Sequence, residues 1–162
     1  DDFFCNHTIV QQIADAFKSY DVNAVYGDVQ FVDPLKNFKI VRYYSSKRFH
    51  VRKFKNGIMP AHPGFYLKRA LFEKYGYYKT DYKIAADFEL LLRLMYIHNI
   101  KTRYLNIPMV SMRKGGVSNK NLFSNYILNR EIKRACTENG VKTNYLRIYS
   151  KYFKKIFEFL GN

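Results

Sequence analysis

The sequence predicts an α/β protein, in which a mixed β-sheet is flanked by helices and followed by a C-terminal helical extension. Short β-branched segments bounded by turn residues alternate with segments whose apolar residues recur at helical spacing. The 162 residues have the size of one domain, and 48% of them are hydrophobic, which is enough for a buried core. We therefore expect a folded domain rather than a disordered chain.

The first half of the chain is expected to place a β-hairpin between two helices. We expect a helix over residues 6–19, strands over 23–32 and 38–44, a short strand over 64–67 and a short helix over 68–75. Asn6 or Thr8 can cap the first helix, and Asp33-Pro34 makes the turn of the hairpin. Gly27 indicates a bulge or a close backbone approach, and Gly76 ends the short helix.

The second half is expected to be mainly helical. We expect a helix over residues 84–98, a strand over 101–112 and two further helices over 121–139 and 144–160. Pro108 interrupts the strand, because proline has no N–H to donate to a neighbouring strand. Residues 113–119 form a glycine-containing loop with two cations. Gly140 ends the helix over residues 121–139.

The helix that begins near residue 84 carries one acid in an unusual position. At about 100° per residue, one apolar stripe contains Ile84, Phe88, Leu91, Leu92 and Met95. Asp87 lies at the edge of this stripe in the first turn, where a carboxylate is either a helix cap or a placed functional acid. Glu89 and Arg93 lie on the opposite side, and we expect an ordinary exposed pair four residues apart.

The charge of the chain indicates an anionic partner. There are 28 Lys and Arg residues against 13 Asp and Glu residues, a formal net charge of +15. Such a surface favours nucleic acid, an acidic membrane face or a phosphorylated substrate. The sequence has no apolar run of about 18 residues and no signal peptide. Cys5 and Cys136 are far apart, which predicts free thiols and a reducing compartment.

Two further groups are candidates with simpler alternatives. His62 lies in a proline-rich loop, where a histidine is either a hydrogen-bonded structural residue or part of a site. The other three histidines, His7, His50 and His98, have no ligand spacing with one another, so we expect no zinc site. Arg113, Lys114 and Gly115-Gly116 could cradle a phosphate, although the segment lacks P-loop spacing and could be a plain basic turn.

The last predicted helix has aromatic and aliphatic residues on one broad face and cations on the rest. Two interpretations stay open, an in-plane membrane anchor and a helix docked on its own domain with a solvated basic face. Its interleaved tyrosines and lysines could also stack on bases, but no recognised nucleic-acid-binding motif accompanies them.

Six short motifs occur in a recognisable order. They are Asp1-Asp2-Phe3-Phe4, Ala24–Val29, Met59–Pro63, Phe72–Gly76, Ala85–Arg93 and Gly115–Ser118. In this order and spacing they resemble the C-terminal part of a bacterial family 2 inverting glycosyltransferase with the GT-A fold. The resemblance covers about residues 1–119 and implies a partial GT-A-type sheet. Residues 120–162 form the helical extension, which is not part of the shared pattern.

The resemblance implies that a sugar is transferred with inversion from a nucleotide-sugar to a saccharide or lipid-linked acceptor. Asp87 matches the catalytic base, which takes the proton of the attacking acceptor hydroxyl. Asp2 matches the residue that ligates Mn²⁺ or Mg²⁺ on the diphosphate, and Asp1 would help to place the ribose or the sugar.

Two other positions match the substrate-binding segments of the family. His62 falls where the family lines the donor–acceptor pocket, whereas Arg113 and Gly116 fall in the segment that closes over the diphosphate. The resemblance also implies a parent enzyme of surface polysaccharide synthesis. That enzyme would be cytoplasmic and peripheral at the inner face of the cell membrane.

The chain departs from the family pattern at its start. It begins at the acidic motif and without an initiator Met, so we expect a fragment that lacks the nucleotide-binding half and is inactive by itself. Such a fragment would expose a sheet edge and self-associate. Two alternatives remain beside the enzyme: a basic nucleic-acid-binding module, which the sequence favours less, and a non-catalytic partner subunit.

Overall fold

The computed structural model describes residues 2–114 and 122–160, with side chains described over 2–114 and 123–152. Its contacts divide the chain into two compact units. Unit 1 consists of Asp1–Phe49, Pro60–Gly76 and Ile100–Val117. Unit 2 consists of His50–Met59, Tyr77–Asn99 and Ser118–Asn162. The predicted division after Asn119 into a catalytic part and a helical extension stays a prediction.

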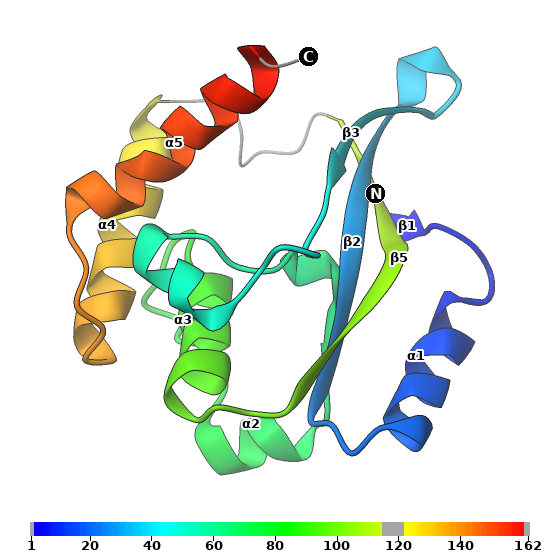
Figure 1. Ribbon diagram of the computed structural model, residues 1–162, viewed down its shortest axis with the longest axis horizontal. Coiled ribbons are helices and arrows are strands. Elements are labelled where there is room, and N and C mark those ends of the chain that lie inside the picture. Colours follow the sequence, from blue (N-terminus) through cyan, green and yellow to red (C-terminus); the bar gives the residue numbers. More distant parts are fainter. Residues whose placement is uncertain (1, 115–121, 161–162) are drawn as a thin grey trace. The chain divides into compact units, whose positions relative to one another are not determined.

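Unit 1 is built on a mixed five-stranded sheet (Figure 1). Its strands are β1 (Phe3–Phe4), β2 (Ala24–Asp33), β3 (Lys39–Tyr44), β4 (Phe65–Leu67) and β5 (Thr102–Arg113). The order is β1-β5-β2-β3, and β4 also pairs with β2. β2 runs parallel to β5 and antiparallel to β3 and β4, whereas β1 is antiparallel to β5. The predicted α/β class with a mixed sheet and flanking helices is therefore confirmed.

The pairing of β2 with β5 explains two sequence features. The register shifts on both sides of Asp28, which faces Pro108 of β5. The expected interruption at Pro108 is thus a local irregularity within one continuous strand, because the missing N–H costs only one ladder bond. At Gly27 the two backbones come so close that an added Cβ would lie 2.8 Å from the carbonyl oxygen of Ile107. The predicted close approach at this glycine is confirmed.

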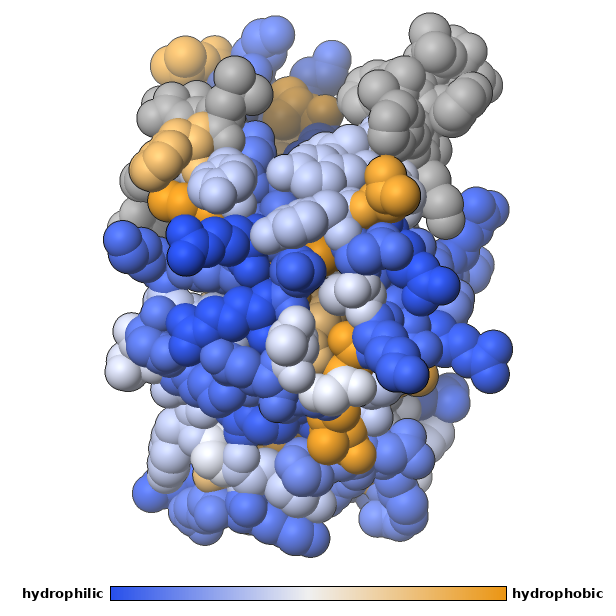
Figure 2. Space-filling model, turned by 90° about the vertical axis from the view of Figure 1, so that its left-hand side faces the viewer, coloured by the Kyte–Doolittle hydropathy of each residue, from blue (hydrophilic) through white to orange (hydrophobic). Residues whose placement is uncertain are grey.

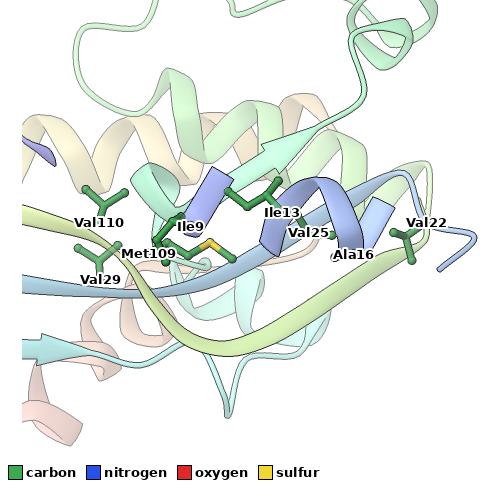
Figure 3. Packing of buried hydrophobic residues seen from close by; sticks show 8 residues of the cluster. All are labelled: Ile9, Ile13, Ala16, Val22, Val25, Val29, Met109 and Val110. Atoms are coloured by element: carbon green, nitrogen blue, oxygen red, sulfur yellow. The ribbon is translucent and has the colours of Figure 1, made fainter. Parts of the chain in front are cut away.

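Helix α1 (Ile9–Ser19) covers one face of the sheet (Figure 1). Its apolar residues pack on β2 and β5 in a buried cluster (Figure 3) that contains Ile9, Ile13, Ala16, Val22, Val25, Val29, Met109 and Val110. The helix begins after Thr8, whose hydroxyl accepts a hydrogen bond from the Gln12 side chain at 2.7 Å rather than capping a backbone N–H. Asn6 accepts from both the N–H and the hydroxyl of Thr8, at 2.9 and 2.7 Å.

Short elements complete unit 1. They are the 3₁₀ turns η1 (Pro34–Lys36) and η3 (His62–Gly64) and the helix α2 (Ala70–Tyr75). Gly76 follows α2 with φ of 89°, a conformation that glycine adopts at little cost. The predicted glycine at the end of this helix is confirmed.

Unit 2 is helical. Its elements are the 3₁₀ helix η2 (Val51–Asn56), α3 (Ala86–Leu92), the π-helical turn η4 (Arg93–Ile97), α4 (Leu122–Glu138) and α5 (Tyr145–Leu160). Phe54 of η2 and Phe88 of α3 are both buried and meet edge to face, with ring centroids 5.5 Å apart. Gly140, with φ of 68°, ends α4 as the sequence predicts.

The start of α5 is docked on its own unit. Ile148 is completely buried, and the hydroxyl of Tyr152 pairs with the side chain of Asn129 on α4 at 3.1 Å. Of the two interpretations that the sequence left open, the docked helix therefore describes residues 145–152. No described helix is long and apolar enough to cross a bilayer. The face in Figure 2 is mostly hydrophilic, with apolar residues in small separate groups.

The prediction that Glu89 and Arg93 form an exposed pair is wrong. The Glu89 side chain is completely buried. Its oxygens accept hydrogen bonds from Arg93 Nε at 3.0 Å and from Asn139 Nδ2 at 3.2 Å, and Lys79 Nζ lies 3.4 Å away. Burial alone would raise the pKa of the Glu89 carboxyl. The hydrogen bonds and positive charges of these partners outweigh burial, so this pKa lies below its ordinary value. The side of the helix that carries Glu89 was expected to face solvent, but Asn139, which is 50 residues away in sequence, helps to cover it.

We expect Gly27→Ala to lower the free energy of unfolding by about 2–3 kcal/mol, because the new methyl meets backbone as well as the Met109 side chain. Denaturant unfolding followed by circular dichroism measures the change. Gly140→Ala is the control: its φ is positive but nothing lies within 4 Å of an added Cβ, so the cost should be about 1 kcal/mol. Equal losses in the two variants would contradict a steric cause at Gly27.

Candidate functional site

Two of the predicted site residues, Asp2 and Arg113, lie at one end of the unit 1 sheet. β1 is antiparallel to β5 with Phe3 opposite Ser111, so the residue before Phe3 reaches the level of Met112 and Arg113. Both Asp2 and Arg113 are exposed. An acid that could hold a cation and a cation that could meet a phosphate are therefore available together at this end of the sheet.

The other predicted site residues are distributed as follows. His62 lies in unit 1 and is half-buried, and Asp87 lies in unit 2 and is half-buried. Asp1 and Gly116 lie outside the described residues.

His62 is held in place by a chain of hydrogen bonds that starts at Asp28. The buried Asp28 carboxylate accepts from the Ser46 N–H at 2.7 Å, and the Ser46 hydroxyl accepts from the Ala61 N–H at 3.2 Å. Ala61 directly precedes His62, the first residue of η3. An added Cβ on Gly64 would lie 3.3 Å from the Gly27 carbonyl oxygen, so η3 lies closely against β2. This arrangement fixes the backbone at His62 to the central strand.

Asp28 is the centre of a polar cluster in unit 1. The residue is only 2% exposed, yet its carboxylate accepts from the hydroxyls of Tyr43 at 2.8 Å and Tyr104 at 3.0 Å. The Ser45 hydroxyl lies 3.3 Å from both oxygens. Burial raises the pKa of both tyrosines, and the hydrogen bond to Asp28 adds to the increase. Both phenols therefore stay protonated and donate to the carboxylate at neutral pH.

Asp87 is the second residue of α3, in the first turn where the sequence places it. Its Oδ1 accepts from the N–H of Phe88 at 2.7 Å, and Phe88 is buried in the unit 2 core. Burial raises the pKa of Tyr78, and the negative charge of Asp87 adds to this increase. A tyrosine hydroxyl thus lies within electrostatic range of the candidate base.

The segment before α3 is clamped by Glu131 of α4. Glu131 is 8% exposed, and its carboxylate accepts three backbone hydrogen bonds, from Lys83 at 2.8 Å, Ile84 at 2.9 Å and Ala85 at 2.8 Å. Burial alone would raise the pKa of Glu131, but the three N–H donors lower it. This ionised clamp fixes the backbone that leads directly into Asp87.

A second acid on α4, Glu138, binds residues that precede this segment in the sequence, Lys79 and Tyr82. Its carboxylate accepts from Lys79 Nζ at 3.0 Å, the Tyr82 hydroxyl at 2.9 Å and Arg134 Nε at 2.6 Å. Arg134 also pairs with Asp81. The hydrogen bond from Lys79 is the largest cause that lowers the pKa of Glu138, to about 2. The loop over residues 79–85 is therefore attached to α4 by side chains at both of its ends.

The described side chains offer limited ligation for a metal. Among residues 2–114 and 123–152, no group of three or more His, Cys, Asp or Glu side chains could hold an ion. Mg²⁺ on a nucleotide diphosphate takes only one or two protein carboxylates and completes its shell with phosphate oxygens and water. The exposed carboxylate of Asp2 fits a cation of that kind, and it does not fit a metal cage made entirely of protein.

The sequence did not single out Asp28 or Glu131, the buried acids that fix the backbone next to His62 and Asp87 respectively. A charged residue in the middle of a β-branched strand was a visible signal for Asp28, because such a residue must be paired when it is buried. Glu131 gave no local signal, since its partners lie 46–48 residues earlier in the chain. No protein-family model and no curated protein sequence matches this chain.

Proposed function

We propose that this chain carries the acceptor-side part of an inverting, nucleotide-sugar-dependent glycosyltransferase. The observation that carries the proposal is the placement of Asp87, half-buried in the first turn of α3 behind a backbone segment that Glu131 clamps with three hydrogen bonds. General base catalysis needs a carboxylate whose position is fixed relative to the hydroxyl that it deprotonates. The resemblance of the six ordered motifs, one of which contains Asp87, to family 2 glycosyltransferases is the second support for the proposal.

In the proposed reaction Asp87 accepts the proton of an acceptor hydroxyl. The acceptor oxygen forms its bond to the anomeric carbon while the bond from that carbon to the diphosphate breaks, which inverts the configuration. The nucleoside diphosphate departs with the bonding electron pair. A Mn²⁺ or Mg²⁺ ion held by Asp2 would offset the charge on the departing diphosphate.

The unit 1 residues have binding roles in this proposal. Arg113 lies at the same end of the sheet as Asp2, which suits a guanidinium that pairs with phosphate oxygens. His62 would line the sugar pocket, with its backbone fixed through Ser46 and Asp28. Asp1 and Gly116 keep the substrate-binding roles that the resemblance gives them.

The proposed biological setting is the synthesis of a surface polysaccharide at the inner face of a cell membrane, on a saccharide or lipid-linked acceptor. The net charge of +15 supports a partner with negative charge, which an anionic membrane or a nucleotide-sugar would both supply. The same charge supports the rival function, a nucleic-acid-binding module, so the experiment has to separate the two.

The test uses the whole product of the open reading frame that contains these residues. We expect release of nucleoside diphosphate from one member of a panel of nucleotide-sugars, dependent on Mn²⁺ or Mg²⁺ and on an acceptor. Asp2→Ala should weaken metal-dependent donor binding by at least about tenfold, measured by calorimetry, because it removes a metal ligand. Asp15→Ala, on the exposed side of α1, is the matched control and should bind the donor normally.

The opposite pattern would support the rival. Tight, salt-sensitive binding to RNA or DNA, together with no binding of any nucleoside diphosphate in the presence of Mn²⁺, would replace the enzyme with a nucleic-acid-binding module.

A further inference from the structure

The turn between β2 and β3 presents apolar side chains to solvent. We call residues 33–39 the hairpin tip; it lies at the end of the sheet away from α1 (Figure 1). Leu35 is 96% exposed, Phe38 is 45% exposed, and Pro34 begins the turn. Tips of hairpins usually carry polar residues or glycine. An aliphatic and an aromatic residue at such a position are unfavourable in water unless something covers them.

The backbone of the hairpin tip is in an unfavourable conformation at Phe38. Asn37 and Phe38 have φ of 50° and 57°, the left-handed region that glycine and asparagine adopt easily and phenylalanine does not. Asp33 holds this conformation, because its side chain accepts from the Leu35 N–H and its carbonyl oxygen accepts from the Phe38 N–H, both at 3.0 Å. An exposed phenylalanine in a costly conformation indicates a role for that side chain outside the fold.

Cations surround the exposed apolar residues. Lys36 and Lys39 belong to the tip, and the guanidinium of Arg113 lies 5.6 Å from the centroid of the Phe38 ring. Phe3 contacts the same ring edge to face at 6.0 Å. The only acid of the tip, Asp33, is 7% exposed and is occupied by the backbone.

The apolar and basic character continues along the edge strand β3. Ile40, Val41 and Tyr43 are 53%, 43% and 49% exposed, and the strand adds Arg42 and no acid. Because successive side chains of a strand point to opposite faces of the sheet, these side chains are divided between the two faces of this edge strand. The edge next to the tip therefore adds exposed apolar side chains and a cation, but no acid.

We propose that the hairpin tip docks on an anionic lipid surface, with Leu35 and Phe38 entering the interface and the lysines meeting the headgroup phosphates. This is the chemistry of interfacial membrane binding, in which apolar insertion and attraction to acidic lipids add together. The proposal uses residues of unit 1 only, and it does not depend on the glycosyltransferase assignment.

Charge argues against a second copy of the chain, and the aliphatic side chains argue against nucleic acid. A second copy of the chain pairing through β3 would bring Lys39 and Arg42 against like charges, since the strand has no acid to offer in return. Nucleic acid would match the cations but not the aliphatic side chains, because Leu35, Ile40 and Val41 have no ring to stack on a base.

The absence of tryptophan from the sequence permits a direct measurement. In Leu35→Trp the 162-residue chain carries one indole, which lies at the tip. Its emission should shift to shorter wavelength when vesicles of phosphatidylcholine with about one third phosphatidylglycerol are added. Leu146→Trp is the matched control, because Leu146 on α5 is 84% exposed and flanked by exposed tyrosines. Its emission should stay unchanged.

Vesicle co-sedimentation of the double variant Leu35→Ser/Phe38→Asn should give at least about tenfold weaker binding than the original chain, because two inserting side chains are lost. The same variant should keep the fold, checked by circular dichroism, since asparagine adopts a positive φ more easily than phenylalanine. Lys36→Gln/Lys39→Gln should also bind less and should lose most of its dependence on salt.

Binding that is equal on pure phosphatidylcholine, or a spectral shift in Leu146→Trp but not in Leu35→Trp, would overturn the proposal. So would an unchanged affinity of the tip variants, or competition by RNA that removes all vesicle binding. Concentration-dependent dimers that the tip substitutions abolish, in the absence of vesicle binding, would assign the surface to a second copy.

Discussion

Asp87→Asn in the whole gene product should reduce glycosyl transfer by at least about 10²–10³-fold while the affinity for the donor stays within about twofold. The amide cannot take up the acceptor proton, so the attacking hydroxyl stays a poor nucleophile. The fold should be preserved, because the asparagine oxygen can still accept the N–H of Phe88 that Oδ1 accepts at 2.7 Å. Turnover under saturating donor and acceptor, compared with donor binding by calorimetry, separates the chemical step from binding.

Asp15→Asn serves as the matched control for this carboxylate-to-amide change. Asp15 is exposed on α1, and its carboxylate accepts a hydrogen bond from Gln11 Nε2 at 2.8 Å. Its replacement should leave turnover and unfolding unchanged. Near-normal turnover in Asp87→Asn, with the control also normal, would remove Asp87 from the role of base.

Glu131→Gln should have the second largest effect, on stability and on rate together. One carboxylate oxygen accepts the Lys83 N–H and the other accepts the N–H groups of Ile84 and Ala85. A glutamine must turn its NH₂ group toward one of these donor sets, which leaves at least one N–H group of the segment facing a donor instead of an acceptor. We expect the free energy of unfolding to fall by about 2–4 kcal/mol.

The same substitution should slow turnover by about tenfold without weakening donor binding, because the backbone that positions Asp87 loosens. Glu73→Gln is the matched control: Glu73 forms an exposed pair with Arg69 four residues away, so the change should be within about 0.5 kcal/mol. A fall in stability with unchanged turnover would make Glu131 a structural residue that does not position the base.

The contribution of Glu131 to the free energy of unfolding should also depend on pH. Its pKa in the folded chain is below the ordinary value of 4.5, so the folded state binds fewer protons than the unfolded state in this range. The stabilisation is therefore complete above about pH 4.5 and is lost as the pH falls through the lowered pKa. The stability difference between the original chain and Glu131→Gln, from denaturant unfolding at several pH values, should shrink only below pH 4.5.

The sequence predicts well those parts of the fold that local chemistry decides. The hairpin of β2 and β3, the glycine-terminated helices α2 and α4, and the close approach at Gly27 all lie within about two residues of their predicted positions. Turn residues, β-branched alternation and glycine conformations act over a few residues, so a short window contains the whole signal.

The features that the sequence did not predict depend on distant partners. Glu89 and Arg93 have the spacing of an exposed helical pair, yet Asn139, 50 residues later, helps to bury Glu89. Glu131 likewise has an ordinary position on its helix, and only the tertiary fold brings it to the segment before α3. Periodicity describes which side of a helix is apolar, but it cannot say whether a polar side will be covered.

The interleaving of the two units has a consequence for the order in which the chain folds. Each unit is assembled from three separate segments, and both need residues beyond position 99. The parallel pairing of β2 with β5 joins residues nearly 80 positions apart, such as Ala24 and Thr102. Closing so long a loop costs entropy before any contact repays it, which makes folding slow. During synthesis, β2 therefore has no parallel neighbour until β5 has also left the ribosome.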